Sequence, residues 1–277
     1  MNLRATLSFL FLLSAFPLLH SQNPSHEMPL PLEKEGMRTH CTMLGIGHLN
    51  QLDTYLSPQE YTGTQVRLLQ ENTKNTKLIH GRVTMQNLIQ ANGGYSQSRT
   101  DKGKYMSGML EWQMALLHHW HVLPRLTLLA GPQLGTHLGF LYNTRNGNNP
   151  AQARLSADLG ISGAALYRFV LWKKTMDLRY QASLQLGGLM FSPQYGQSYY
   201  EIFSLGHSDH NICFTSPFAA PNIDQLITLD AHLGKGTLRI GLQGLVRQSH
   251  VNEIKTHDWS FAFLVGYVKN FQLVLSR

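Results

Sequence analysis

Hydrophobic and polar residues alternate along much of this chain with a period of two. The segment Leu110–His121 reads LEWQMALLHHWH; its even positions include Trp112 and Trp120, and its odd positions include Glu111 and Gln113. Successive side chains of a β-strand point to opposite faces, so this alternation predicts a strand whose two faces meet different environments. The same pattern recurs in three further segments, 153–167, 177–186 and 238–247.

The alternation predicts a barrel built from long strands. Most of the predicted strands are longer than the usual five or six residues, and about 9–11 residues suffice for a tilted strand to cross a membrane. Within 192–224 we expect two more strands, 199–206 and 210–216, because a structureless stretch of this length is unusual. The preferred count is therefore twelve, with ten as the alternative if 192–224 is one large loop. The ten long strands are predicted at 42–51, 63–73, 81–96, 106–121, 125–142, 153–170, 176–191, 225–234, 237–248 and 258–271.

The predicted connections fall into two classes that alternate along the chain. An antiparallel up-and-down barrel has tight turns at one rim and longer loops at the other, so this alternation favours that architecture. Short connections are predicted at 122–125, 172–175 and 234–236, and long polar ones at 96–105, 143–152 and 249–258.

The aromatic residues indicate that this barrel spans a membrane. Trp112 and Trp120 are eight residues apart on one face, roughly 27 Å along a strand and roughly 20 Å along the membrane normal after a tilt of about 40°. Aromatic side chains favour both membrane interfaces. A soluble sandwich or a lipocalin-like barrel would show the same alternation with its apolar face inward. The strand length, the low charge and an export signal favour the membrane barrel.

Composition and the N-terminus support an exported globular domain. Hydrophobic residues make up 43% of the 277 residues and charged residues only 14%, which excludes an extensively disordered chain. A basic start followed by an apolar run at 5–19 predicts a signal peptide at 1–21. We then expect a flexible lead-in at 22–40 and a single barrel domain at 41–277. Whether Cys41 and Cys213 form a disulfide stays open.

Three segments resemble a known family. They are GIGHLNQLDTYLSPQEYTG (45–63), YNTRNGNNPAQARLSADLGISG (142–163) and FSPQYGQSYYEIFSLG (191–206). They look like domain-of-unknown-function family 3316, an uncharacterised family of outer-membrane barrels from Bacteroidetes. The resemblance extends from about residue 42 to residue 271. It implies a barrel, an export signal and the bacterial outer membrane, but no activity and no catalytic residues.

Charged residues on the inward face are the first candidates for function. They would form either a structural network of paired carboxylates and guanidiniums or a path for ions and solutes, because unpaired buried charges are costly. Basic residues outnumber acidic ones among them, which would favour anions in a conducting pore. The candidates are Arg67, Glu71, Arg82, Glu111, Arg154, Asp158, Arg168, Asp177, Arg179, Asp230, Arg239 and Arg247.

A second candidate is a small polar site at His137, Asp158 and Ser162. Inward positions on neighbouring strands could hold a nucleophile, a base and an orienting carboxylate, although a hydrogen-bonded network would look the same in sequence. His207–Asp209 also resembles such a group but fits a polar turn better, because adjacent residues point apart. His119 and His121 are too few for a zinc site, so no metal or cofactor is expected.

These observations leave two classes of function. We expect an outer-membrane barrel that is either a narrow passive pore or a structural or binding component. The alternative is a membrane-embedded hydrolase acting on lipid A or phospholipid acyl chains, and its catalytic residues stay unknown. The net charge of +7 and the tyrosine-rich loops favour contact with outer-membrane lipid and lipopolysaccharide, and with small solutes or glycans, but not with nucleic acid.

Overall fold

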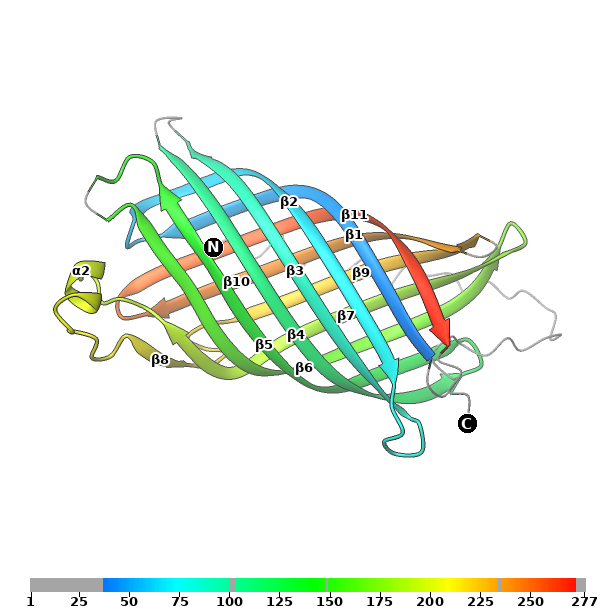
Figure 1. The fold of residues 1–277 in the computed structure, drawn as a ribbon. Helices are drawn as coiled ribbons and strands as arrows, with labels where there is room; N and C mark the ends of the chain where they lie inside the picture. Colours follow the sequence, from blue (N-terminus) through cyan, green and yellow to red (C-terminus); the bar gives the residue numbers. More distant parts are fainter. Residues whose placement is uncertain (1–36, 100–102, 148, 234–235, 273–277) are drawn as a thin grey trace.

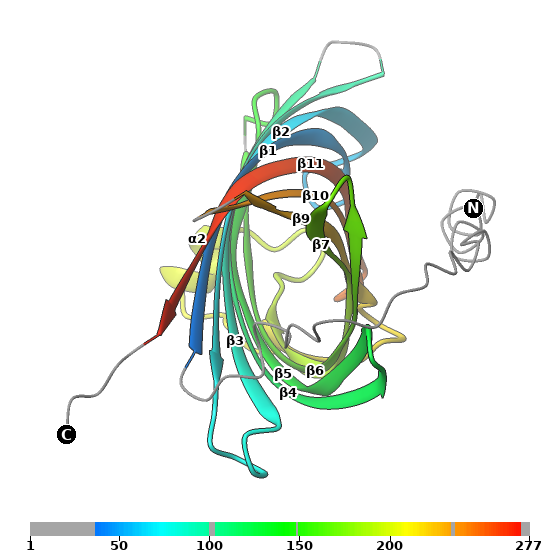
Figure 2. The ribbon, with the colours of Figure 1, turned by 90° about the vertical axis from the view of Figure 1, so that its right-hand side faces the viewer.

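The computed structural model describes residues 37–99, 103–147, 149–233 and 236–272, which form a closed barrel of tilted strands (Figures 1 and 2). The predicted signal peptide and the first part of the predicted lead-in lie outside the described residues. The long strands are β1 (Met37–Asp53), β2 (Ser57–Asn75), β3 (Val83–Ser98), β4 (Lys104–Leu123), β5 (Leu126–Asn143), β6 (Ala151–Leu171), β7 (Lys174–Phe191), β9 (Asn222–Leu233), β10 (Gly236–Val251) and β11 (Ile254–Gln272).

Strand pairing closes the sheet on itself. Each long strand pairs antiparallel with the next long strand in sequence. β11 returns to pair with β1 along the whole length of β1. The predicted all-β, up-and-down barrel is thus confirmed. Closure lets the wall satisfy its backbone hydrogen bonds internally, which a membrane requires. Among the described residues, no helix is long and apolar enough to cross a membrane.

The preferred count of twelve strands is wrong, and the alternative of ten long strands is right. The segment predicted as a strand at 199–206 begins instead with a short helix, α2 (Tyr199–Phe203), visible at the left of Figure 1. Ser198 and Glu201 form a capping box, in which each side chain satisfies a backbone N–H of the first helical turn. The short strand β8 (Ile212–Thr215) is real, but it pairs only with the end of β7, three residues beyond the part of β7 that pairs with β9. Together β8 and β9 fill one strand position.

The connections predicted as short or long lie at different rims as expected, with one exception in length. We call the rim where β1 begins and β11 ends the terminal rim, and the opposite rim the loop rim. The predicted long loop at 249–258 is wrong, because β10 and β11 pair as far as a two-residue turn at the loop rim. Asn252 and Glu253 form this turn with φ angles of 51° and 62°. Such left-handed pairs match the twist of a hairpin, so the strands continue where a loop was expected.

The two faces of the wall are chemically distinct. Trp112 and Trp120 are 36% and 48% exposed on the outer surface, whereas Glu111 is 4% exposed inside. Large apolar side chains cover the outer face of most strands, as a lipid-facing wall requires. The interior combines polar side chains with three clusters of buried apolar residues, the largest of which we call the inner apolar cluster. It consists of Cys41, Met43, Leu69, Leu88, Leu226, Leu264 and Val268. Both cysteines are free.

A charge placed on the outer face tests the orientation of the wall. Ile161 lies at the centre of the 21-residue strand β6 and is 49% exposed. We expect Ile161→Arg to destabilise the barrel by about 2–4 kcal/mol, and Leu171→Arg, at the end of the same strand, by about 0–1 kcal/mol. Urea unfolding in lipid vesicles measures both. Equal losses at the two positions would contradict a lipid-facing wall.

Candidate functional site

The polar side chains of the interior form two clusters separated by a central layer. The terminal cluster, in the half of the barrel near the terminal rim, is centred on Glu71. The loop cluster, in the other half, is centred on Arg247 and Glu111. Each cluster joins strands that are not neighbours in the sheet, because its side chains reach across the lumen.

Glu71 is the centre of the terminal cluster and is 2% exposed. Arg179 of β7 donates to both of its carboxylate oxygens, at 2.5 and 2.9 Å. Arg239 of β10 donates a hydrogen bond to Glu71. It also donates to Asp230 from Nε and Nη2, at 2.6 and 2.7 Å. Gln86 adds a hydrogen bond to Glu71 at 2.5 Å. One carboxylate therefore ties β2 to three other strands through charge-assisted hydrogen bonds.

A second set of contacts completes the terminal cluster. Arg168 and Asp177 are directly opposite each other on β6 and β7, and their two hydrogen bonds measure 2.6 and 2.8 Å. His232 of β9 contacts Asp177 through Nε2 at 2.9 Å. The three arginines and three carboxylates of this cluster balance in charge.

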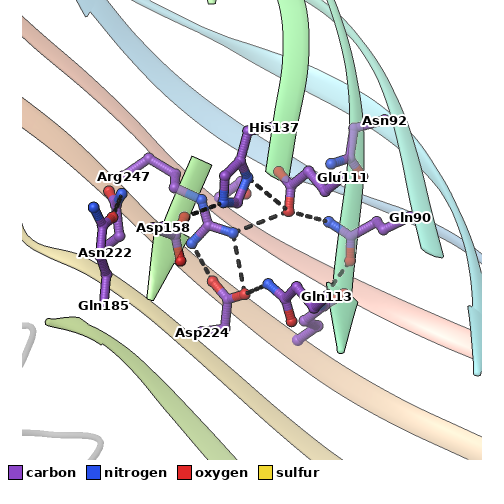
Figure 3. Close-up of polar contacts among 12 residues, drawn as sticks. Gln90, Asn92, Glu111, Gln113, His137, Asp158, Gln185, Asn222, Asp224 and Arg247 are labelled. Carbon is purple, nitrogen blue, oxygen red and sulfur yellow. Dashed lines mark hydrogen bonds and ion pairs between the residues drawn. The ribbon is translucent and has the colours of Figure 1, made fainter. Parts of the chain in front are cut away.

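Arg247 is the centre of the loop cluster (Figure 3). It donates to Asp224 through both terminal nitrogens and to Glu111 at 2.9 Å. Gln113 donates to Asp224 at 2.5 Å. The guanidinium thus joins β10 to β9 on one side and to β4 on the other.

His137 extends the loop cluster to β6. Its Nε2 lies 2.9 Å from Asp158 and its Nδ1 lies 3.8 Å from Glu111. Both ring nitrogens therefore face carboxylates, and only the imidazolium form can donate from both. Gly135 makes room for this arrangement, because a Cβ there would lie 2.7 Å from a carboxylate oxygen of Asp158.

The central layer separates the two clusters. Arg67 is 1% exposed and donates to Asn92, Gln243 and Ser260, each at 2.9 Å. Gln243 also donates to Gln90 at 2.8 Å. The inner apolar cluster lies between Arg67 and Glu71, because Leu264 is in the same row of the sheet as Arg67, whereas Cys41 and Leu88 are ladder partners of Glu71.

Two cavities lie on opposite sides of this layer. The loop-side cavity has a volume of about 100 Å³, and Glu111, His137, Arg154 and Arg247 are among its lining residues. The terminal-side cavity has a volume of about 80 Å³ and borders the terminal cluster. The two share no lining residue. Each has room for a few water molecules or a small group.

Aromatic side chains at the loop rim pack with Leu141, which also lines the loop-side cavity, and we call them the aromatic cover. Tyr61 and Tyr105 stack with their ring centres 3.6 Å apart. Burial raises the pKa of Tyr55 to about 12, so its hydroxyl stays protonated and donates to the carbonyl of Gln197 at 2.7 Å. Tyr199 of α2 accepts a hydrogen bond from the backbone of β6 at 2.7 Å. The segment that contains α2 therefore folds over the mouth of the barrel.

The structure brings together only some of the predicted site residues. It joins His137 to Asp158, but Ser162 lies four residues farther along β6, roughly 13 Å away, and bonds to Gln181 and Ser183 instead. The predicted group His137–Asp158–Ser162 is therefore not assembled. Residues 207–209 are exposed in a loop. His119 bonds to Thr84 inside, whereas His121 is exposed at the rim, so the two histidines have different surroundings.

The expected excess of basic residues in the lumen is wrong. Arg82 is exposed in the turn between β2 and β3 rather than directed inward. Asp224 was missed because its strand begins at Asn222, three residues before the predicted start. Six of the predicted arginines remain beside eight carboxylates, so the charges give no preference for anions. The carboxylates are Asp53, Glu71, Glu111, Asp158, Asp177, Asp224, Asp230 and Asp258.

Removing the charge at the centre of the terminal cluster should destabilise the fold. Glu71→Gln leaves Arg179 and Arg239 without their shared carboxylate, and breaking a buried pair in this way costs about 3–5 kcal/mol. Glu60→Gln, exposed on the same strand, is the matched control and should change stability by less than about 0.5 kcal/mol. Equal free energies of unfolding for both variants in vesicles would contradict the assigned role of Glu71.

Several solved barrels align with most of this chain at low sequence identity. The transport unit of the autotransporter AIDA-I from Escherichia coli is 9% identical, with a TM-score of 0.47 over 87% of this chain and 92% of that one. The outer membrane protease OmpT from Escherichia coli is 6% identical, with a TM-score of 0.47 over 85% and 97%. The β domain of the Bordetella autotransporter BrkA is 10% identical, with a TM-score of 0.43 over 86% and 100%.

Sequence comparison gives the family directly. None of the curated proteins compared with this chain matches it. A family model described as "Protein of unknown function (DUF3316)" matches residues 7–277, which is most of the sequence. The chain therefore belongs to the DUF3316 family, as the three quoted segments suggested.

Proposed function

We propose that this protein is a barrel of the bacterial outer membrane that does not conduct freely and that binds a small ligand in its loop-side cavity. The ten-stranded wall with an apolar outer face and an aromatic pair on β4 supports the membrane setting. Of the two roles predicted from the sequence, the binding or structural role fits the interior better than the passive pore.

One observation carries this proposal, namely the central layer. Arg67 extends into the lumen and joins β2 to β3, β10 and β11 with three side-chain hydrogen bonds, and the inner apolar cluster lies between it and Glu71. Apolar constrictions resist wetting. Moving a buried guanidinium away from three hydrogen-bond partners costs free energy, because its donors would be left unsatisfied. Ions would therefore meet a barrier between two separate cavities rather than a continuous water column.

The hydrolase alternative receives less support. His137 is the histidine in the loop-side cavity, and carboxylates face both of its ring nitrogens. A general base needs a free nitrogen beside the hydroxyl that it deprotonates. Ser162 also bonds elsewhere, so the described interior lacks an assembled nucleophile and base.

Electrical recording tests the closed lumen. We expect purified protein, shown to be folded and inserted in a planar bilayer, to produce no stable conductance steps. Arg67→Ala should produce brief steps, because it removes the side chain that extends into the lumen in the central layer. Stable, salt-dependent steps from the unmodified protein would overturn the proposal and restore the passive pore.

A further inference from the structure

The barrel wall is irregular where β7 changes partners. β9 pairs with β7 over 176–184, and β8 pairs with it over 188–191. The residues between, 185–187, have no ladder partner on that edge. On the opposite edge Leu186 is an extra residue, because consecutive β6 residues pair with the residues on either side of it. A bulge bends a strand and weakens the local ladder.

The neighbouring segment, 216–221, widens this break. It leaves β8 and joins β10, where its carbonyls of Ala219 and Pro221 accept backbone hydrogen bonds of 2.8 and 3.2 Å. In the described chain, the ladders pair β8 with β7 alone, so its other edge has no strand beside it. We call the break bounded by 185–187, β8 and 216–221 the wall notch.

The outer side of the wall notch is apolar. Ile212 and Phe214 of β8 are each 73% exposed, and Phe218 is 99% exposed. The ring of Phe214 lies 3.5 Å from the position that a Cβ on Gly187 would occupy, so it covers the unpaired part of β7. This apolar surface continues the lipid-facing wall towards the loop rim.

The inner side of the wall notch is polar and borders the loop-side cavity. Gln185, Thr215 and Asn222 line that cavity from β7, β8 and β9. Asn222 donates to Gln185, and Gln185 donates to Thr215 at 3.1 Å. These three side chains hold the inner side of the notch together with two neutral hydrogen bonds, in contrast to the ion pairs elsewhere in the interior.

The loop-side cavity also contains donors without acceptors. Arg154 and Arg247 both line it, and the Nε–H of each is buried with no hydrogen-bond partner among the described residues. A buried donor without an acceptor is costly, so the cavity favours a ligand that supplies oxygen acceptors. A guanidinium accepts a carboxylate or phosphate group especially well.

We propose that an amphiphile with one chain and an anionic head group enters the loop-side cavity sideways through the wall notch. Its head group meets Arg154 and Arg247, and its chain stays outside against Phe214 and Phe218. The inference rests on the proposed function, because the aromatic cover and the central layer block the two axial routes and leave the wall as the remaining route.

A reversible lock across the wall notch tests the route. Asn252 of the β10–β11 turn and Cys213 of β8 both contact the carbonyl of His210, at 3.0 and 3.1 Å. Asn252→Cys therefore places a second thiol where a disulfide can join β8 to the turn. The double variant Cys213→Ser/Asn252→Cys is the control, because it carries the same turn substitution but cannot form the bond.

Native mass spectrometry of the full-length protein gives the readout. Dodecyl phosphate is the probe, inorganic phosphate represents the head group alone, and dodecanol represents the chain alone. We expect one dodecyl phosphate per protein, at least tenfold less after oxidation of Asn252→Cys, and recovery after reduction. The control variant should not respond to oxidation. Equal binding by the oxidised and reduced forms, or equal retention of inorganic phosphate or dodecanol, would overturn the proposal.

A second variant covers the case in which the disulfide does not form. Phe218→Ser changes a side chain that is almost fully exposed, so the fold should tolerate it, and we expect several-fold weaker retention of dodecyl phosphate. Phe263→Ser, at an exposed position on β11 that does not line the loop-side cavity, is the matched control and should retain the probe normally. Equal retention of dodecyl phosphate by the two variants would refute entry through the wall notch but not the proposed function. Conductance by the unmodified protein would instead refute the closed lumen.

Discussion

Closure of the sheet is the constraint on which the rest of this structure depends. A closed wall leaves no edge, and it also directs every second side chain into an interior too narrow to hold bulk water around each charge. Glu71 shows the result, because its carboxylate is satisfied by Arg179 and Arg239 from the far wall rather than by solvent. The charges that meet across the lumen, such as Glu71 and Arg179, therefore hold together strands that never pair.

Alternation with a period of two was enough to predict the barrel, the membrane-facing side and all ten long strands, eight of them to within four residues at each end. It failed where local chemistry overrode the pattern. The capping box at Ser198 and Glu201 starts a helix in a segment that otherwise looks like a strand. The left-handed turn at Asn252 and Glu253 lets a polar segment continue the ladder, although polar residues usually indicate a loop.

The interior site was predictable in part for a similar reason. An odd or even position within a strand tells which face of the wall a side chain takes, so Glu111, Arg179 and Arg247 could be assigned to the lumen. It does not tell how far along the barrel axis the residue lies, and contacts across the lumen depend on that height. The Glu71–Arg179 pair spans 108 positions in sequence, and no local pattern marks it. Ser162 failed as a site residue for the same reason, since it shares a face with Asp158 at a different height.

The pairing of β1 with β11 has a kinetic consequence. Residues as far apart as Cys41 and Val268 are direct neighbours in this seam, so the barrel cannot close until almost the whole chain has been made. Loop-closure entropy makes such contacts slow to form, and until then β1 and β11 both present unpaired edges. A chain with this topology needs its open edges shielded during assembly, and a truncation that removes β11 would leave a sheet with two exposed edges rather than a smaller barrel.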